Sequence, residues 1–185
     1  MKKLLVAIAM LLAGPMPAAA ASWTVDYAKS HLGFQVQWSG EAFTAAFKTW
    51  KADITFDPAD LAHAHAVVTI DLASEASDAA DNDEGLKGPE GFRVSKFPTA
   101  VFETSGFASK GGNAYVATGT LSLHGAKRPV SLPFTLTITG NQAHMTGKAA
   151  VLRTDFGLGT GDWAGETPIA HQVFITIDLT ATKSG

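Results

Sequence analysis

Three histidines in this 185-residue chain have the residue type and, in part, the spacing of ligands for a metal ion or a haem iron: His63, His65 and His171. His63 and His65 are two positions apart, so in an extended segment both imidazoles point to the same face. The sequence near this pair contains no evident third ligand, and His171 is far along the chain. A haem or metal site is therefore an alternative function, weighed against ordinary solvated histidines.

A second group with possible chemistry is Arg153, Asp155 and His171, the candidates for contact with the polar end of a bound ligand at the mouth of the fold. Arg153 and Asp155 share one face if the backbone is extended, where they would form an ion pair or orient a ligand. His171 precedes the last predicted strand and is placed to face an opening.

Nucleophilic catalysis has little support in the sequence. It contains no G-x-S-x-G motif, and no Ser/His/Asp set is selected by spacing. The carboxylates of Asp81, Asp83 and Glu84 lie in an acidic stretch, where a solvated surface is the ordinary interpretation. We therefore expect no enzyme, and an enzyme that modifies a bound ligand is the least favoured alternative.

The first 21 residues have the pattern of a cleaved signal peptide. Lys2 and Lys3 precede the apolar run from Leu4 to Leu12, and small residues at 19–21 form a cleavage site. We expect residues 22–185 to form a single domain that is exported to a bacterial periplasm.

Composition excludes several classes of protein. The chain has no cysteine, which excludes disulfides, thiolate metal sites and covalently attached haem. Without Lys2 and Lys3 the formal charge of −3 becomes −5, because two of the 14 basic residues are lost. A mildly acidic chain without a basic run is a poor candidate for binding nucleic acid.

Alternating apolar and polar residues predict about eight strands separated by turn signals. Strands are expected at 23–27, 32–38, 66–72, 100–107, 114–123, 130–136, 143–152 and 173–179, with a long, bent strand over 43–56. The acidic stretch at 73–91 predicts one or two short helices across the barrel or its mouth. This pattern favours an all-β, antiparallel sheet closed into a barrel over a sandwich.

The hairpin at 119–136 sets the period of this sheet, with a basic turn predicted over His124–Pro129. Pro133 stands inside its second strand, and proline has no N–H for a ladder. Pro133 therefore predicts an edge, a bulge or a rim, and an exposed edge there leaves a homodimer possible.

An eight-stranded barrel either fills with side chains or encloses one small ligand. The candidates for lining such a cavity are the large apolar residues of the predicted strands and their flanking loops, and an ordinary core is the alternative for each of them. They are Phe34, Val36, Trp38, Phe43, Phe47, Phe92, Phe97, Phe102, Phe107, Leu121, Leu123, Phe134 and Trp163.

Five segments, taken in order, resemble the YceI-like family of bacterial periplasmic polyisoprenoid-binding proteins, and the resemblance covers nearly the whole mature chain. They are Tyr27–Val36 (YAKSHLGFQV), Ile54–Pro58 (ITFDP), Lys96–Phe102 (KFPTAVF), Gly119–Gly125 (GTLSLHG) and Arg153–Gly157 (RTDFG). The segment from Gly159 to Ala164 (GTGDWA) is similar to the branch associated with membrane b-type cytochromes.

The resemblance implies a lipocalin-like barrel whose apolar cavity holds an isoprenoid lipid, either a polyprenyl chain or a quinone, with no covalent cofactor. It also implies a membrane b-type cytochrome as a possible partner. The chain departs from the family where many members have R-D-x-x-L-R, because residues 82–88 read NDEGLKG here. This departure puts the headgroup preference in question.

Overall fold

The computed structural model describes residues 21–184, so the predicted signal peptide lies, except for Ala21, outside the described residues. Strands dominate this part of the chain, and one α-helix, α1 (Ala80–Lys87), interrupts them. The strands are β1 (Ser22–Val25), β2 (His31–Trp38), β3 (Glu41–Phe47), β4 (Trp50–Thr55), β5 (His65–Asp71), β6 (Glu75–Ala76), β7 (Thr99–Gly111), β8 (Ala114–Leu123), β9 (Ala126–Thr139), β10 (Gln142–Leu152) and β11 (Ile169–Lys183).

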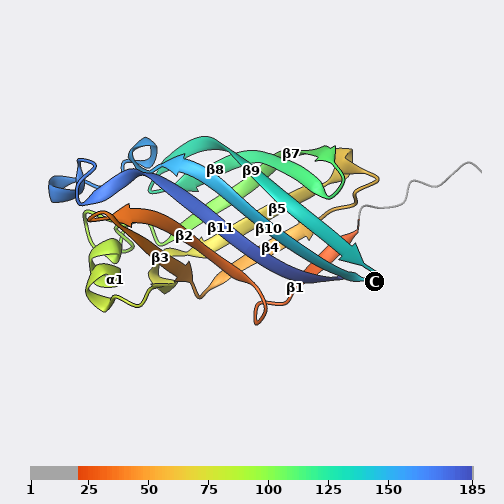
Figure 1. Cartoon of the computed structure of the whole chain (residues 1–185), viewed down its shortest axis with the longest axis horizontal. Helices are drawn as coiled ribbons and strands as arrows, with labels where there is room; N and C mark the ends of the chain where they lie inside the picture. Colours follow the sequence, from red (N-terminus) through yellow and green to blue (C-terminus); the bar gives the residue numbers. More distant parts are fainter. Residues whose placement is uncertain (1–20, 185) are drawn as a thin grey trace, which may run out of the picture.

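The strands form one antiparallel sheet that closes on itself, as Figure 1 shows. The order is β1-β4-β5-β7-β8-β9-β10-β11-β2-β3-β6, and pairing of β1 with β11 completes the ring. β1 and β2 occupy one position in the barrel wall, as do β3 and β4, and β5 and β6, so the eleven strands fill eight positions. The predicted eight-stranded, lipocalin-like barrel is confirmed, and the long strand predicted over 43–56 is β3 and β4, separated at Lys48 and Thr49.

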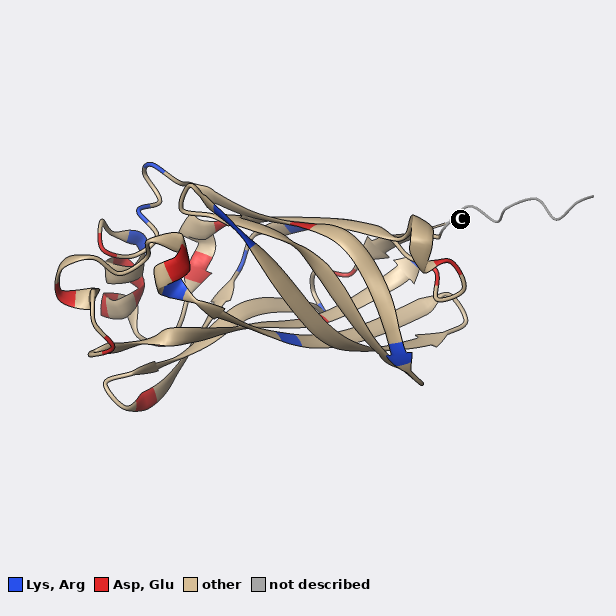
Figure 2. Cartoon of the chain, turned by 90° about the horizontal axis from the view of Figure 1, so that it is seen from above, with Lys and Arg blue, Asp and Glu red and all other residues tan. Residues whose placement is uncertain are grey.

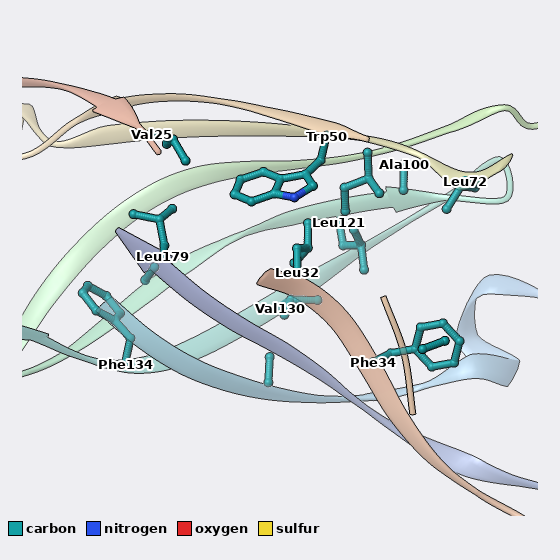
Figure 3. Packing of buried hydrophobic residues seen from close by; sticks show 14 of the residues in the cluster. Val25, Leu32, Phe34, Trp50, Leu72, Ala100, Leu121, Val130, Phe134 and Leu179 are labelled. Carbon is teal, nitrogen blue, oxygen red and sulfur yellow. The ribbon is translucent and has the colours of Figure 1, made fainter. Parts of the chain in front are cut away.

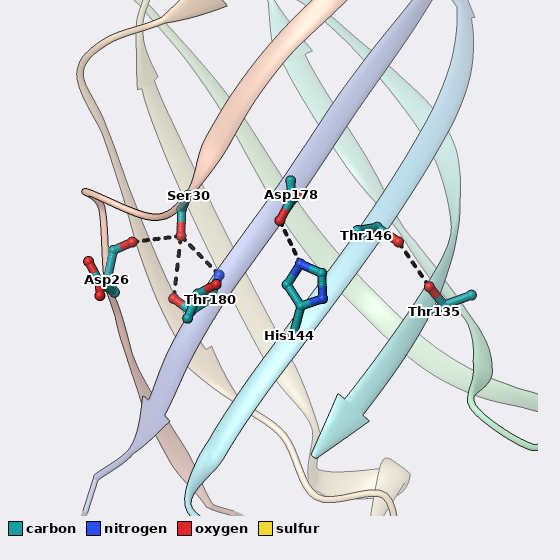
Figure 4. A network of polar contacts seen from close by, with 7 residues as sticks. All are labelled: Asp26, Ser30, Thr135, His144, Thr146, Asp178 and Thr180. Carbon is teal, nitrogen blue, oxygen red and sulfur yellow. Dashed lines mark hydrogen bonds and ion pairs between the residues drawn. The ribbon is translucent and has the colours of Figure 1, made fainter. Parts of the chain in front are cut away.

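The break between β1 and β2 is bridged by a side chain. Ser30 is buried, and its hydroxyl donates to the carbonyl oxygen of Asp26 at 2.8 Å, while the N–H of Thr180 on β11 donates to Ser30 Oγ at 3.0 Å (Figure 4). A side chain thus satisfies backbone groups that the interrupted ladder leaves unpaired. The barrel wall stays closed across the bend.

The β8–β9 hairpin corrects one prediction. Its turn consists of His124 and Gly125 alone, at φ 52° and 80°, and not of the whole segment His124–Pro129. Two residues with positive φ give the twist that a two-residue hairpin requires, and glycine adopts this conformation without a steric cost. Residues 127–129 therefore belong to β9.

The two ends of the barrel differ in structure and in charge. At one end lies a cap, defined here as residues 80–92, which comprises α1 and the segment that follows it. Acidic residues gather at this end in Figure 2, and α1 carries Asp81 and Asp83 in its first turn. In residues 21–184 no helix is long and apolar enough to cross a membrane.

Candidate functional site

Two apolar cavities lie inside the barrel, one behind the other. The cap-end cavity has a volume of about 110 Å³ and the distal cavity about 100 Å³. Side chains alternate between the two faces of a strand, so every second residue of β11 points into the barrel. Of these inward residues, Val173 and Ile175 line the cap-end cavity, and Ile177 and Leu179 line the distal cavity. Figure 3 shows Leu32, Leu121 and Val130 pointing into the middle of the barrel.

The cap-end cavity is enclosed by strands on its sides and by loops and the cap at its mouth. Phe92 and Leu86 reach it from the cap, and Trp163 from the loop between β10 and β11. The Phe34 ring is 6.0 Å from the Phe92 ring, and Trp38 is 5.4 Å from Trp163. Edge contacts between aromatic rings therefore join the cap and this loop to β2.

The distal cavity is enclosed by strands and an aromatic cluster. Phe56 is 5.2 Å from Phe107, 5.7 Å from Tyr115 and 6.3 Å from Phe134, and the rings of Tyr115 and Phe134 are stacked at 5.5 Å. Most of the lining is aliphatic or aromatic carbon. Large rigid rings fill this end of the barrel.

The few polar groups beside the distal cavity are satisfied by the protein. The N–H of Ala66 donates to Thr104 Oγ1 at 2.8 Å, and Trp23 Nε1 donates to the carbonyl oxygen of Phe56 at 2.8 Å. An apolar cavity that offers water no partners stays dry and accepts hydrocarbon instead. The lining of the distal cavity is therefore chemically suited to an apolar chain.

Arg153 is the charged residue in the lining of the cap-end cavity, and it is 6% exposed. It begins a short 3₁₀ helix, η3 (Arg153–Phe156), and its guanidinium donates to four backbone carbonyls, two in the loop between β10 and β11 and two at the start of β11. These are the oxygens of Leu158 at 3.0 Å, Ile169 at 2.8 Å, Ala170 at 3.1 Å and Gly165. Burial lowers the pKa of Arg153, and the charge of Glu166 acts in the opposite direction. Arg153 holds the loop at the mouth in place.

Glu75 on β6 is a second buried ionisable group at the cap end, and it is 1% exposed. Within residues 21–184 neither of its carboxylate oxygens has a hydrogen-bond partner. Burial, helped by the negative charge of Asp83 on α1 and opposed by Lys87, raises the pKa of Glu75 to about 7. The cap therefore packs over a carboxyl group that is readily protonated.

Asp83 is held ionised by its neighbours. Burial acts to raise the pKa of Asp83, but hydrogen bonds from Ser77 and the charge of Lys87 outweigh it, and the pKa lies below its ordinary value. The Ser77 N–H donates to Asp83 Oδ2 at 2.9 Å, and the Ser77 hydroxyl donates to Oδ1. This contact ties α1 to the end of β6.

Most residues proposed from the sequence line one of the two cavities. The cap-end cavity is lined by Phe34, Val36, Trp38, Phe47, Phe92, Leu121, Leu123, Arg153 and Trp163, and the distal cavity by Phe102, Phe107 and Phe134.

Four proposed residues lie outside both linings. Phe43 packs against Trp38, with ring centres 5.1 Å apart, and Phe97 packs against His124 at 4.5 Å. Asp155 is exposed and does not pair with Arg153, because the backbone is helical there and turns the two side chains to opposite sides. His171 contacts the carbonyl oxygen of Ala164 at 3.3 Å and Glu166 at 3.5 Å.

The alternative metal or haem site is not assembled. His63 pairs with Asp60 at 2.7 Å, and His65 begins β5 near the distal cavity, whereas His171 lies at the start of β11 near the cap. Within residues 21–184 no three His, Asp or Glu side chains cluster in the way that a metal ion requires. The three histidines do not converge on one site.

The sequence reasoning missed several lining residues. Ile54, Val68 and Met145 line the distal cavity, and Phe156, Leu158 and Ile169 line the cap-end cavity. Period-two alternation marks the first three, whereas the last three lie in or beside irregular segments that carry no periodic signal.

Comparisons with known proteins agree with this architecture. A family model described as the YceI-like domain matches residues 23–181. A UPF0312 protein of Vibrio cholerae is 30% identical over 135 residues, which cover 70% of this chain and 71% of that protein.

Solved structures share the fold. BcnA of Burkholderia cenocepacia superposes with a TM-score of 0.83 at 33% identity, covering 86% of this chain and all of BcnA. A polyisoprenoid binding domain from Saccharophagus degradans has a TM-score of 0.65 at 16% identity, covering 90% of this chain and all of that domain. The chain belongs to the YceI-like family.

Proposed function

We propose that this protein binds an isoprenoid lipid, a polyprenyl chain or a quinone with an isoprenoid tail, inside the barrel. The observation that carries the proposal is the pair of apolar cavities in series along one closed barrel. A flexible, narrow, methyl-branched chain fits a narrow bore of this kind better than a compact ligand does.

The energetics favour such a chain. Each buried CH₂ group contributes about 0.8 kcal/mol, so two or three isoprene units offer roughly 10 kcal/mol before the cost of association. A long isoprenoid does not cross an aqueous compartment unaided, and we propose that the protein carries or stores it in the periplasm. A membrane b-type cytochrome is the proposed partner for a quinone cargo.

The comparisons support the proposal at the level of the family. The domain from Saccharophagus degradans is described as polyisoprenoid binding, and its fold is the one found here. The two cavities of this chain have the apolar linings that a polyisoprenoid ligand requires, which supports the proposal.

Organic extraction of the purified native protein followed by mass spectrometry tests the proposal. We expect an isoprenoid lipid in the extract, and we expect the stripped protein to take up ubiquinone-10 from phosphatidylcholine vesicles. Quenching of the fluorescence of Trp38 and Trp163, which line the cap-end cavity, reports uptake. Repeated absence of lipid together with no quinone uptake would overturn the proposal.

A pair of variants separates binding from folding. Leu136 lines the distal cavity and is partly buried, while Thr137 is exposed on the other face of β9. Leu136→Arg should abolish uptake because it places a charge in the bore, and Thr137→Arg should bind as the parent protein does. Circular dichroism checks that both variants are folded, and equal uptake by the two would contradict an internal binding site.

A further inference from the structure

The barrel wall has a seam between β9 and β10. These strands pair from Gln142↔Thr139 to Gly147↔Phe134, and within residues 21–184 no β9–β10 pair is formed beyond that point. Figure 4 shows the paired part, where the hydroxyls of Thr135 and Thr146 lie 2.9 Å apart. The seam comprises residues 129–133 of β9 and 148–152 of β10. It is about 16 Å long at the usual rise per residue.

Two prolines explain why the ladder stops. The N–H of Leu136 donates to the carbonyl oxygen of Asn113, on the side of β8, and backbone groups alternate sides along a strand. Position 135 and the other odd-numbered positions therefore face β10. Pro129 and Pro133 occupy two of these positions and have no N–H to donate. Of the edge, bulge or rim predicted at Pro133, the structure shows a local edge, because β9 is not paired with β10 at this position.

A groove of about 190 Å³ follows the seam on the outside of the barrel. Its walls include the residues that a continued register would have paired, Val130 with Val151 and Pro129 with Leu152. Val151 and Phe156 line both this groove and the cap-end cavity. These two side chains alone are shared by the two linings, so they form the wall between cavity and groove.

Phe156 closes the seam by side-chain packing and one hydrogen bond, without a strand ladder. Its side chain is 2% exposed, and its carbonyl oxygen accepts a hydrogen bond from His124 Nδ1 at 3.1 Å. His124 belongs to the β8–β9 turn and lies against the Phe97 ring. One side-chain hydrogen bond thus takes the place of the backbone ladder that joins neighbouring strands elsewhere in the wall. Breaking one hydrogen bond costs less free energy than breaking a ladder.

We propose that the seam is a lateral portal, through which the apolar chain of the ligand enters the cap-end cavity sideways when Phe156 swings out. This inference rests on the proposed function. A lateral opening lets a long chain pass from a membrane into the bore without threading its full length through one end of the barrel.

The rim of the portal suits the polar end of such a ligand. Arg128, Gln172 and Asp155 border the groove. The guanidinium of arginine and the amide of glutamine donate hydrogen bonds to oxygen acceptors, whether quinone carbonyls or phosphates. The acidic cap offers few such donors, so the headgroup remains at the seam while the chain fills the bore.

Cross-linking the seam tests the portal, and the absence of native cysteine makes this practical. Ser131→Cys with Ala150→Cys places two thiols at opposite positions of the seam, and a short bis-maleimide joins them. We expect at least a tenfold slower uptake of ubiquinone-10 from phosphatidylcholine vesicles after cross-linking, with mass spectrometry confirming the link. The same protein without the linker should take up quinone at the parent rate.

A matched control joins the same strands where they are already paired. Thr135→Cys with Thr146→Cys lies in the ladder, and its cross-link should leave the uptake rate unchanged. Unchanged uptake in the cross-linked seam variant would overturn the portal and direct attention to the cap. If the parent protein takes up no quinone at all, the proposed function fails instead, so the two failures are distinct.

Removing the gate is a second, independent measurement. Phe156→Ala should raise the rates of both uptake and release several-fold, while Phe97→Leu, which alters only the packing on His124, should change them less. A Phe156→Ala variant that remains folded and exchanges quinone at the parent rate would also overturn the proposal.

Discussion

The cap end and the distal end of the barrel close similar cavities by different means. At the distal end, strands joined by tight hairpins and a packed aromatic cluster do the closing. At the cap end, one helix, a 3₁₀ turn and a long loop are held by side chains such as Arg153 and Phe92. Ladders open cooperatively, whereas individual side-chain contacts are broken one at a time. The cap end therefore holds the contacts that can open one at a time, and the proposed portal at Phe156 lies beside the cavity of this end.

Among the variants that compare the two ends, replacement of Arg153 should lower the free energy of unfolding the most. Arg153→Met removes hydrogen bonds to four carbonyls and leaves these buried acceptors unpaired, so the free energy of unfolding should fall by about 4 kcal/mol. Urea denaturation measures the change. Lys148→Met is the control, because this exposed lysine bonds Gln35 and lies over the exposed side of the Phe174 ring, and its loss should cost about 1 kcal/mol. Similar losses for both variants would mean that the loop does not depend on Arg153.

Truncating one aromatic residue at each end of the barrel should give the next largest losses in the free energy of unfolding. Phe134→Ala in the distal cluster should cost about 3–4 kcal/mol, because strands on both sides prevent collapse of the space that it leaves. Phe92→Ala should cost about 2 kcal/mol, since the cap can relax inward. Chemical denaturation compares the two variants, and a larger loss for Phe92→Ala would reverse the comparison.

Protonation of Glu75 should give the smallest effect, confined to the cap end. Its folded pKa of about 7 exceeds the ordinary value of 4.5, so the folded state binds more protons between these values. The contribution of Glu75 to stability should therefore be greatest at or below about pH 4.5. As the pH rises to about 7, the free energy of unfolding should fall by on the order of 2 kcal/mol. Unfolding measured from pH 4.5 to 8 tests this.

Glu75→Gln is the matched variant for the pH experiment. It keeps the shape of the side chain but cannot ionise, so its stability should lack the decline between pH 4.5 and 7. Identical pH profiles for the variant and the parent protein would show that Glu75 does not titrate under the cap.

Much of the barrel follows from the sequence because alternation is a local property. The positions of Leu121, Leu123 and Phe134 on the inner face are set by the period of their own strands, and short turns fix which strands are neighbours. The predicted helix across the mouth also has a local cause, since most of this acidic stretch is poor in large apolar residues and rich in helix formers, although its start, β6, pairs with β3.

The cap-end contacts could not be predicted in the same way. Arg153 bonds carbonyls up to 17 residues away, and Asp155 turns outward because the chain leaves the extended conformation after Leu152. Burial of Glu75 depends on α1 folding over β6. These positions are decided by tertiary packing in irregular segments, for which residue type and spacing carry no signal.

The pairing of β11 has a consequence for the order of folding. This strand ends the described chain, yet it pairs with β10, β2 and β1, and so supplies the final closure of the wall. A chain that emerges from its N-terminus cannot complete the barrel until its last 15-residue strand is free. Contacts of such long sequence separation make folding slow and leave apolar strand faces exposed meanwhile. Until β11 pairs, the strands β10, β2 and β1 lack their neighbour in the wall, and the core between them stays open.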